Sequence, residues 1–336
     1  MSGNDYRRLK VLSVVGAGRS GTTLLASILG EVEGVTSAGE LRWLWERGVG
    51  EERPCGCGHP PSSCPVWSPV VEATRQRLAA GAPPRTISDL VAAQHELKRR
   101  TGFPRVLRTL GDPGAAQWSA QRSAQWSALR LVRDNVEVAC RTLAATTEAA
   151  VVVDTSKRPL DAAVMAGIPD IDTYVLHVVR DARAVVHSWR RAKTFTTAGV
   201  TRTMGTRGLT STVRRWIGNA VYAELLRHRL AADRWLPLRY EDFAAHPRET
   251  IESVLAFLGE PASAPFLDAH TARLHPNHIV AGNPSRFTTG DVSIRPDDAW
   301  QREMPLRDQR LVASMTLPLL LRYGYLVNTG HAAGIR

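Results

Sequence analysis

The stretch Val11-Leu-Ser-Val-Val-Gly-Ala-Gly-Arg-Ser-Gly-Thr-Thr-Leu-Leu25 decides the fold of this chain. A short apolar, β-branched run ends at glycines, and apolar residues then return at helical spacing, which predicts a strand, a loop and a helix N-terminus. Gly16, Gly18 and Gly21 allow the backbone to curl around an anion. A nucleoside-triphosphatase loop would place a lysine where Thr22 stands. The loop therefore predicts a site for an anion other than a γ-phosphate.

Composition narrows the class of protein. With 336 residues and 43% hydrophobic content, the chain is long enough to bury one large α/β core. We expect no transmembrane segment, because no apolar run approaches the thickness of a bilayer. The polar N-terminus does not resemble a secretory signal, which predicts a cytoplasmic protein. The net charge of +11 predicts a polyanionic partner, and the scattered basic residues favour a charged cofactor over nucleic acid.

Apolar runs predict an α/β fold. Continuous apolar strands separated by helices are typical of a parallel sheet covered on both faces. The pattern predicts strands over 10–15, 151–154, 173–179 and 235–239, and helices over 22–31, 182–191 and 250–258. Residues 70–149 read as helical, with breaks at Pro83-Pro84 and at 111–114. A short duplication in this region places Trp118 and Trp126 on one side of a helix, which favours packing over a ligand platform.

A second segment, Val178-Val-Arg-Asp-Ala-Arg-Ala-Val-Val-His-Ser-Trp189, follows a predicted strand. Ligands collect at the carboxyl ends of parallel strands, so Arg180 is expected at the same edge as the glycine loop. Its planar guanidinium suits a phosphate. The alternative is an ion pair with Asp181 or a contact with a helix terminus.

Together, Gly-Arg-Ser-Gly-Thr-Thr and Val-Arg-Asp-x-Arg-x-x-x-x-Ser resemble the paired signatures of the sulfotransferase family, including tyrosylprotein and carbohydrate sulfotransferases and bacterial relatives. That family uses 3′-phosphoadenosine 5′-phosphosulfate (PAPS) as co-substrate and releases adenosine 3′,5′-bisphosphate (PAP). The resemblance implies that Arg180 and Ser188 hold the 3′-phosphate. It also implies that the 5′-phosphosulfate is held by Arg19, Ser20, Gly21, Thr22 and Thr23.

The resemblance extends along most of the chain. Leu238-Arg-Tyr-Glu-Asp-Phe243 is similar to a family segment that would bring Tyr240 near the nucleotide. The stretch 282–287, with Asn283 and Arg286, is similar to the loop that closes over the cofactor. The implied fold is a P-loop-like central parallel sheet flanked by helices. We expect one sulfotransferase domain over 1–336, with a mainly helical insertion over 68–149 as a candidate cap over the acceptor site.

Sulfuryl transfer needs in-line positioning and charge neutralisation, together with a base for the acceptor. Glu40, in Thr36-Ser-Ala-Gly-Glu40, is the candidate base, because a Gly-Glu here resembles tyrosylprotein sulfotransferases. Burial beside Trp43 and Trp45 is expected to raise its pKa. The alternative is a helix-capping glutamate. His187 is a weaker competitor, because it falls inside a predicted helix.

Lys157 follows the strand at 151–154 and is the candidate cation for the bridging oxygen, again by resemblance. The alternatives are an exposed loop lysine or the use of Arg158 instead. Asp154 ends the same strand, as a magnesium ligand of a kinase would. A sulfonate carries less charge than a terminal phosphate, so no metal is expected.

Cys55, Cys57 and Cys64 crowd together with His59 in one short segment. Four such groups suit zinc, but Cys-x-Cys is tighter than the usual spacing and no second cysteine pair follows. We therefore predict a structural loop near the acceptor entrance without a metal. Cys140 is expected to be buried.

Residues 194–212 lack apolar periodicity and predict a mobile acceptor lid. Basic residues in and beside it would suit an acidic acceptor or the cofactor's phosphates, namely Arg202, Arg207, Arg214 and Arg215. Relatives carry a further arginine near the position of Ala192, and the sequence leaves open whether Arg191 or Lys193 replaces it.

The sequence thus predicts a PAPS-dependent sulfotransferase of the EC 2.8.2 type. Its acceptor would be a hydroxyl or amine of a small molecule, a glycan or a lipid-like compound, and the sequence decides neither this acceptor nor the oligomeric state. The alternatives are a kinase that uses ATP and Mg²⁺ and a non-enzymatic binder of nucleotides or polyanions.

Overall fold

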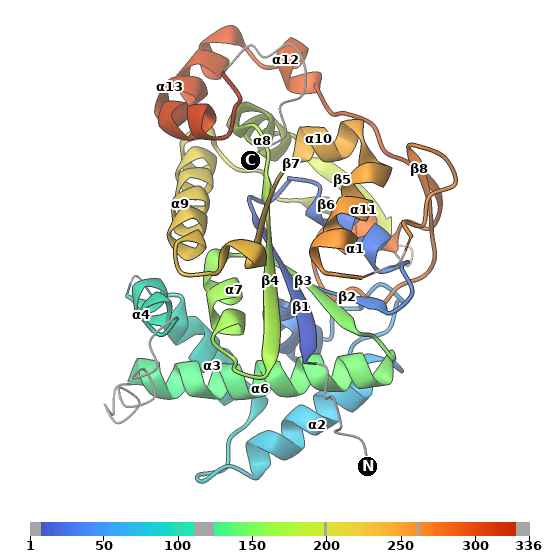
Figure 1. Cartoon of the computed structure of the whole chain (residues 1–336), viewed down its shortest axis with the longest axis vertical. Coiled ribbons are helices and arrows are strands. Elements are labelled where there is room, and N and C mark those ends of the chain that lie inside the picture. Colours follow the sequence, from blue (N-terminus) through green and yellow to red (C-terminus); the bar gives the residue numbers. More distant parts are fainter. Residues whose placement is uncertain (1–7, 100, 111–123, 198–199, 261–262, 327–336) are drawn as a thin grey trace.

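Five parallel strands form the central sheet of the computed structural model, which describes residues 8–99, 101–110, 124–197, 200–260 and 263–326 (Figure 1). In spatial order the strands are β2 (Val35–Gly39), β3 (Val151–Lys157), β1 (Leu9–Gly16), β4 (Ile171–Val179) and β7 (Trp235–Arg239). Strands β2 and β3 lie on one side of β1, and the later strands β4 and β7 lie on the other. The carboxyl end of β1 therefore lies where the strand order reverses, which is where ligands bind in such sheets.

The predicted parallel sheet is confirmed, with each predicted strand present and most of them extended by one to three residues. Strand β2 is the element that the sequence reading missed. Only Val35 in Val-Thr-Ser-Ala-Gly is strongly apolar, so the run carries no signal of a buried strand. It is nevertheless mostly buried at the edge of the sheet, and Gly39 brings the chain directly to Glu40.

Helices cover both faces of the sheet. One layer contains α1 (Thr22–Leu29), α10 (Tyr240–Ala245) and α11 (Pro247–Phe257), and the other contains α6 (Ala124–Thr146), α7 (Pro159–Ala166) and α9 (Leu209–Arg227). Alternation along β1 serves both layers, since Val11 packs with the α6 side and Leu12 with the α1 side. The expected arrangement of a sheet flanked by helices is confirmed.

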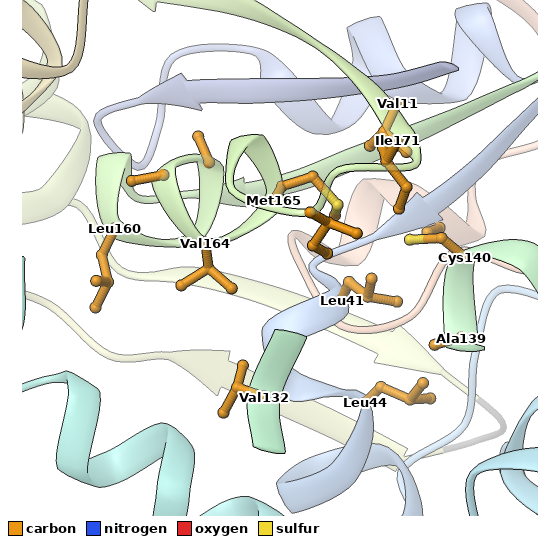
Figure 2. Packing of buried hydrophobic residues seen from close by; sticks show 14 of the residues in the cluster. Val11, Leu41, Leu44, Val132, Ala139, Cys140, Leu160, Val164, Met165 and Ile171 are labelled. Atoms are coloured by element: carbon orange, nitrogen blue, oxygen red, sulfur yellow. The ribbon is translucent and has the colours of Figure 1, made fainter. Parts of the chain in front are cut away.

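The mainly helical region begins after a short stretch of irregular helix that follows Glu40. It contains α2 (Trp67–Ala79), α3 (Ile87–Leu97), α4 (Gly102–Arg108) and α6, after the short helices η1 (Leu41–Trp43) and η2 (Leu44–Gly50). The predicted break at Pro83-Pro84 separates α2 from α3. Figure 2 shows Leu41 and Leu44 beside Val132 and Ala139 of α6, within one core cluster that also includes Val11 of the sheet. The helical region therefore shares the core of the sheet.

Two expectations for this region have different outcomes. The pairing of Trp118 with Trp126 lies outside the described residues, because Trp118 does; Trp126 itself is partly buried against the core. Cys140 is fully buried, as predicted.

The expectation of an irregular loop over 194–212 is wrong. The segment forms a hairpin of β5 (Lys193–Thr197) and β6 (Val200–Met204), and α9 begins at Leu209. Threonine is β-branched and favours strands, so the threonine-rich composition that looked loop-like supports the hairpin.

The C-terminal part of the chain completes the fold above the carboxyl ends of the strands (Figure 1). A third core cluster joins α8 (Ala182–Arg190) to α13 (Leu306–Arg322). The remaining elements are η3 (Ala232–Arg234), β8 (Thr271–Leu274), η4 (Pro284–Phe287), β9 (Gly290–Ser293) and α12 (Ala299–Glu303). None of the described helices has both the length and the apolarity needed to cross a bilayer.

Candidate active site

A cavity of about 700 Å³ opens at the carboxyl ends of β1 and β3. Its walls come from the β1–α1 loop, the segment after β2, the end of β3, α9 and the stretch 282–285. Among the described residues that line it, Glu40 is the only acidic side chain. The cationic side chains of the lining are Arg19, Arg42, Arg47, Lys98, Arg99, Lys157, Arg158, Arg207 and Arg215. This balance of charge favours an anionic ligand.

The β1–α1 loop forms one wall with its backbone exposed to the cavity. Gly21 has a φ of 73°, and a Cβ there would lie 2.7 Å from the ring of Tyr240, so only glycine fits. Helix α1 then begins at Thr22 without a side chain capping its first turn. The free amide hydrogens at this helix start, with Thr22 and Thr23 lining the cavity, provide donors for an anion.

Arg19 lines the cavity with a guanidinium that the protein does not satisfy. All three guanidinium nitrogens are buried and have no hydrogen-bond partner, although the side chain lies over the ring of Trp189 at 4.8 Å. Desolvation by burial lowers its pKa. A desolvated guanidinium without acceptors is costly, so an anion in the cavity would satisfy it.

Glu40 and Lys157 form an ion pair in the cavity wall. The Lys157 Nζ donates to Glu40 Oε1 at 2.5 Å, and Arg42 Nε lies 3.5 Å from Glu40 Oε2. Lys157 has a φ of 68° and its carbonyl accepts a hydrogen bond from Asn219 of α9. Both Lys157 and Arg19 thus adopt a left-handed backbone conformation that side chains disfavour, as is found at functional sites.

The expected upward shift of the Glu40 pKa is wrong. Burial does raise the pKa, but the charges of Lys157, Arg42 and Arg47 and the hydrogen bond from Lys157 outweigh it, and the net shift is downward. Trp43, which the sequence analysis gives as an apolar neighbour of Glu40, instead lies against cationic side chains. The guanidinium groups of Arg42 and Arg47 lie 4.2 and 3.6 Å from its ring centroid. Glu40 is therefore ionised at neutral pH.

One family model matches part of the chain. Residues 132–264 match the model of the sulfotransferase family, a segment that runs from within α6 to just beyond the end of α11. It contains Lys157, Arg180, Ser188 and Tyr240, while the β1–α1 loop and Glu40 precede it. No curated protein sequence is significantly similar to the chain.

Solved sulfotransferase structures are similar at low identity. The sulfotransferase domain of the Synechococcus PCC 7002 olefin synthase is 16% identical with a TM-score of 0.42, over 94% of this chain and 98% of that domain. The sulfotransferase domain from the curacin biosynthetic pathway is 14% identical with a TM-score of 0.44, over 93% of this chain and 98% of that domain. Sulfotransferase STF9 from Mycobacterium avium is 13% identical with a TM-score of 0.44, over 95% of this chain and 78% of that one.

Within residues 132–264, Arg180 is buried and two of its three guanidinium nitrogens are engaged by the protein. One nitrogen donates to the carbonyl of Arg19 at 2.7 Å and another to the carboxylate of Asp297 at 2.8 Å, while Nε has no partner. Its guanidinium also lies 4.3 Å from the ring centroid of Tyr240. The predicted alternative partner Asp181 instead binds Arg183. Arg180 is thus joined directly to the loop that carries Arg19.

Other predicted residues surround the cavity without all lining it. Ser20 and Ser188 are buried and are not part of the lining, and Tyr240 packs beneath Gly21. Asn283 lines the cavity, and its amide donates to the Thr23 hydroxyl at 3.4 Å. Arg286 points elsewhere, donating to the carbonyls of Gly282 and Pro54.

Asp154 and His187 are not part of the cavity lining. Asp154 Oδ1 accepts hydrogen bonds from the amides of Leu41 and Ser156 and from the Ser156 hydroxyl. It therefore ties the end of β3 to the segment after Glu40. His187 contacts the Glu303 carboxylate at 3.2 Å.

Sequence reasoning missed several of the cations that define the site. Arg42, Arg47 and Lys98 surround Trp43, from positions before, after and far beyond it in the chain. The interleaved basic and aromatic residues of Leu41-Arg-Trp-Leu-Trp-Glu-Arg47 were the available signal for the first two. Of the predicted lid arginines, Arg207 and Arg215 line the cavity.

Proposed function

We propose that this chain transfers the sulfuryl group of PAPS to a hydroxyl or amine of an acceptor, without a metal in the chemistry. The carrying observation is the unpartnered guanidinium of Arg19 in the same cavity as the Glu40–Lys157 pair. The family of residues 132–264 supports transfer of a sulfuryl group.

The described residues fit PAPS. The amide hydrogens at the start of α1, the hydroxyls of Thr22 and Thr23 and the guanidinium of Arg19 would hold the 5′-phosphosulfate. Arg180 would hold the 3′-phosphate with Ser188 close by. When bound, PAPS supplies a sulfuryl group on a phosphate leaving group.

The residues of the chain then perform the proton transfer and the charge neutralisation. Glu40 is ionised at neutral pH and so is in the form that accepts a proton from the acceptor. Its partner Lys157 would neutralise charge on the bridging oxygen. An anion that draws Lys157 away from Glu40 removes a charge that lowers the Glu40 pKa, and this strengthens Glu40 as a base.

The acceptor would lie against the helical insertion. Leu97 and Phe103 line the cavity, and Phe103 stacks on Tyr222 of α9 with ring centroids 4.4 Å apart. These side chains form an apolar part of a lining whose charged residues are mostly cations. We infer that residues 68–149 cover the acceptor within a single sulfotransferase domain, and that the acceptor pairs an apolar surface with the reacting group.

The rival kinase function lacks support at two positions. Thr22 stands where a triphosphatase lysine would be, and the Oδ1 of Asp154 is held by three donors of the protein, away from the cavity lining. Titration calorimetry with PAP, and with ATP plus Mg²⁺, separates the two functions. We expect PAP to bind without a metal and more tightly than ATP; tighter binding of ATP with Mg²⁺ would overturn the proposal.

Arg19→Ala is the informative variant for this titration. Losing charge-assisted hydrogen bonds of about 1.5–3 kcal/mol predicts PAP binding about 10- to 100-fold weaker. Arg141→Ala is the matched control, because Arg141 is an exposed residue that pairs with Glu137 on α6. Equal affinities for the two variants would remove Arg19 from the anion site.

A further inference from the structure

Three thiols and an imidazole meet in a cluster that the proposed reaction does not use. Cys55, Cys57, Cys64 and His278 each present a ligand atom, and these atoms all lie within 4.8 Å of one another. Cys55 and Cys64 are fully buried and the other two are partly buried. His278 is separated from Cys64 by 214 positions, so folding alone brings it to the cysteines.

The distances have the scale of a tetrahedral metal site. The sulfurs of Cys55 and Cys57 each lie 3.7 Å from that of Cys64, and the His278 Nδ1 lies 3.1 Å from it. Zinc–sulfur bonds of about 2.3 Å place the sulfurs of a tetrahedron roughly 3.8 Å apart. We propose that Cys55, Cys57, Cys64 and His278 bind one Zn²⁺ ion. This replaces the expectation of a metal-free loop.

Hydrogen bonds hold the cysteine segment against the segment that carries His278. The amide of Cys55 bonds to the carbonyl of His59 at 3.0 Å, and the amide of Gly56 bonds to the carbonyl of Ile279 at 3.0 Å. The Trp67 indole donates to the His278 carbonyl at 2.6 Å and so holds the His278 segment against the start of α2.

The cluster fits a metal better than a disulfide. The shortest separation between two of its sulfurs is 3.1 Å, and all four cysteines of the chain are free thiols. A disulfide among three cysteines would leave one thiol over and would give His278 no role. His59 is not among the four residues whose ligand atoms all lie within 4.8 Å of one another, and its ring Nδ1 lies 3.7 Å from the sulfur of Cys57.

The ion would fix one wall of the active-site cavity. The extended segment that carries His278 continues to Val280, whose carbonyl accepts a hydrogen bond from the amide of Glu40 at 2.9 Å. It then reaches Gly282 and Asn283, which line the cavity. Four protein ligands leave no open position, so the metal has a structural role and the transfer chemistry stays metal-independent.

Metal analysis of the full-length protein, purified without chelators, tests the proposal. We expect about one zinc per chain by plasma mass spectrometry, and its release when the thiols are modified. Loading the metal-depleted protein with Co²⁺ should give the visible absorption of tetrahedral cobalt and a thiolate charge-transfer band. A wild-type protein that takes up neither Zn²⁺ nor Co²⁺, or whose mass shows a disulfide, would overturn the proposal.

Two histidine variants locate the site. His278→Ala should lose the cobalt spectrum of the four-ligand site and most of the zinc, whereas the matched control His59→Ala should keep both. If His59→Ala loses the zinc and the cobalt spectrum while His278→Ala keeps them, the assignment of His278 as the fourth ligand is wrong. Metal content and spectrum do not depend on sulfuryl transfer, so they stand apart from the test of the proposed function.

Discussion

Replacing Glu40 with glutamine separates catalysis from binding of the cofactor. Glutamine keeps the shape of the side chain and can still accept a hydrogen bond from Lys157, but it cannot take a proton from the acceptor. We therefore expect turnover to fall while binding of PAP persists. Turnover falls while the affinity for PAP does not, and loss of folding would lower both.

The magnitudes follow from the contacts of the carboxylate. A positioned general base contributes about 10²- to 10⁴-fold to the rate, so kcat should fall by that factor. The carboxylate also neutralises Lys157 and Arg42, at 2.5 and 3.5 Å. Two charges several ångströms apart interact by about 2 kcal/mol near a protein surface, so removing the negative charge should strengthen PAP binding by up to about thirtyfold.

The assay measures PAP release under PAPS saturation and PAP affinity by calorimetry, for wild type, Glu40→Gln and the control Glu137→Gln. Glu137 pairs with Arg141 on α6 and neither lines the cavity, so its variant should match wild type in both readouts. A Glu40→Gln enzyme with kcat within a few-fold of wild type would show that Glu40 is not the base.

Three further substitutions test other parts of the site. Asp297→Asn removes the carboxylate that competes for Arg180, so calorimetry should show PAP binding several-fold tighter; weaker binding would mean that Arg180 does not face the 3′-phosphate. Burial raises the pKa of Asp154 to about 7, so the folded protein binds more protons than the unfolded one between about pH 4 and 7, and stability to urea should fall as pH rises through that window. Asp154→Asn should abolish this pH dependence and leave sulfuryl transfer intact. Loss of transfer in this variant would instead fit a role of Asp154 as a magnesium ligand. Gly21→Ala should lower the free energy of unfolding by about 1–3 kcal/mol more than Gly34→Ala, because both glycines have left-handed φ values but only Gly21 would meet a ring; equal losses would contradict the close contact with Tyr240.

The sheet could be predicted from the sequence because its central strands carry continuous apolar runs. Residues 151–154 and 173–179 are mostly buried, and strands that are buried on both faces can be recognised by their continuous apolar composition. Strand β2 could not be predicted in the same way, since its burial comes from the neighbours that fold over a short, small-residue edge. The hairpin over 193–204 was missed because its pattern is polar.

The site was predictable in its parts but not in its electrostatics. Glu40 and Lys157 each follow a strand at the ligand edge, and the structure brings them into contact. The direction of the Glu40 pKa depends on cations from other segments, such as Arg47, and only the fold shows that they converge. The engagement of Arg180 by Asp297 and the arrival of His278 beside Cys64 likewise join positions more than a hundred residues apart.

The most direct test of the account is a transfer measurement with PAPS carrying a labelled sulfuryl group. A panel of small-molecule, glycan and lipid-like hydroxyl and amine acceptors is incubated with the enzyme in buffer without added Mg²⁺, and the products are identified by mass spectrometry. We predict that the label moves to at least one acceptor with equimolar release of PAP, and that Glu40→Gln abolishes it. Phosphoryl transfer from ATP that requires Mg²⁺, with no transfer from PAPS to any acceptor, would contradict the account.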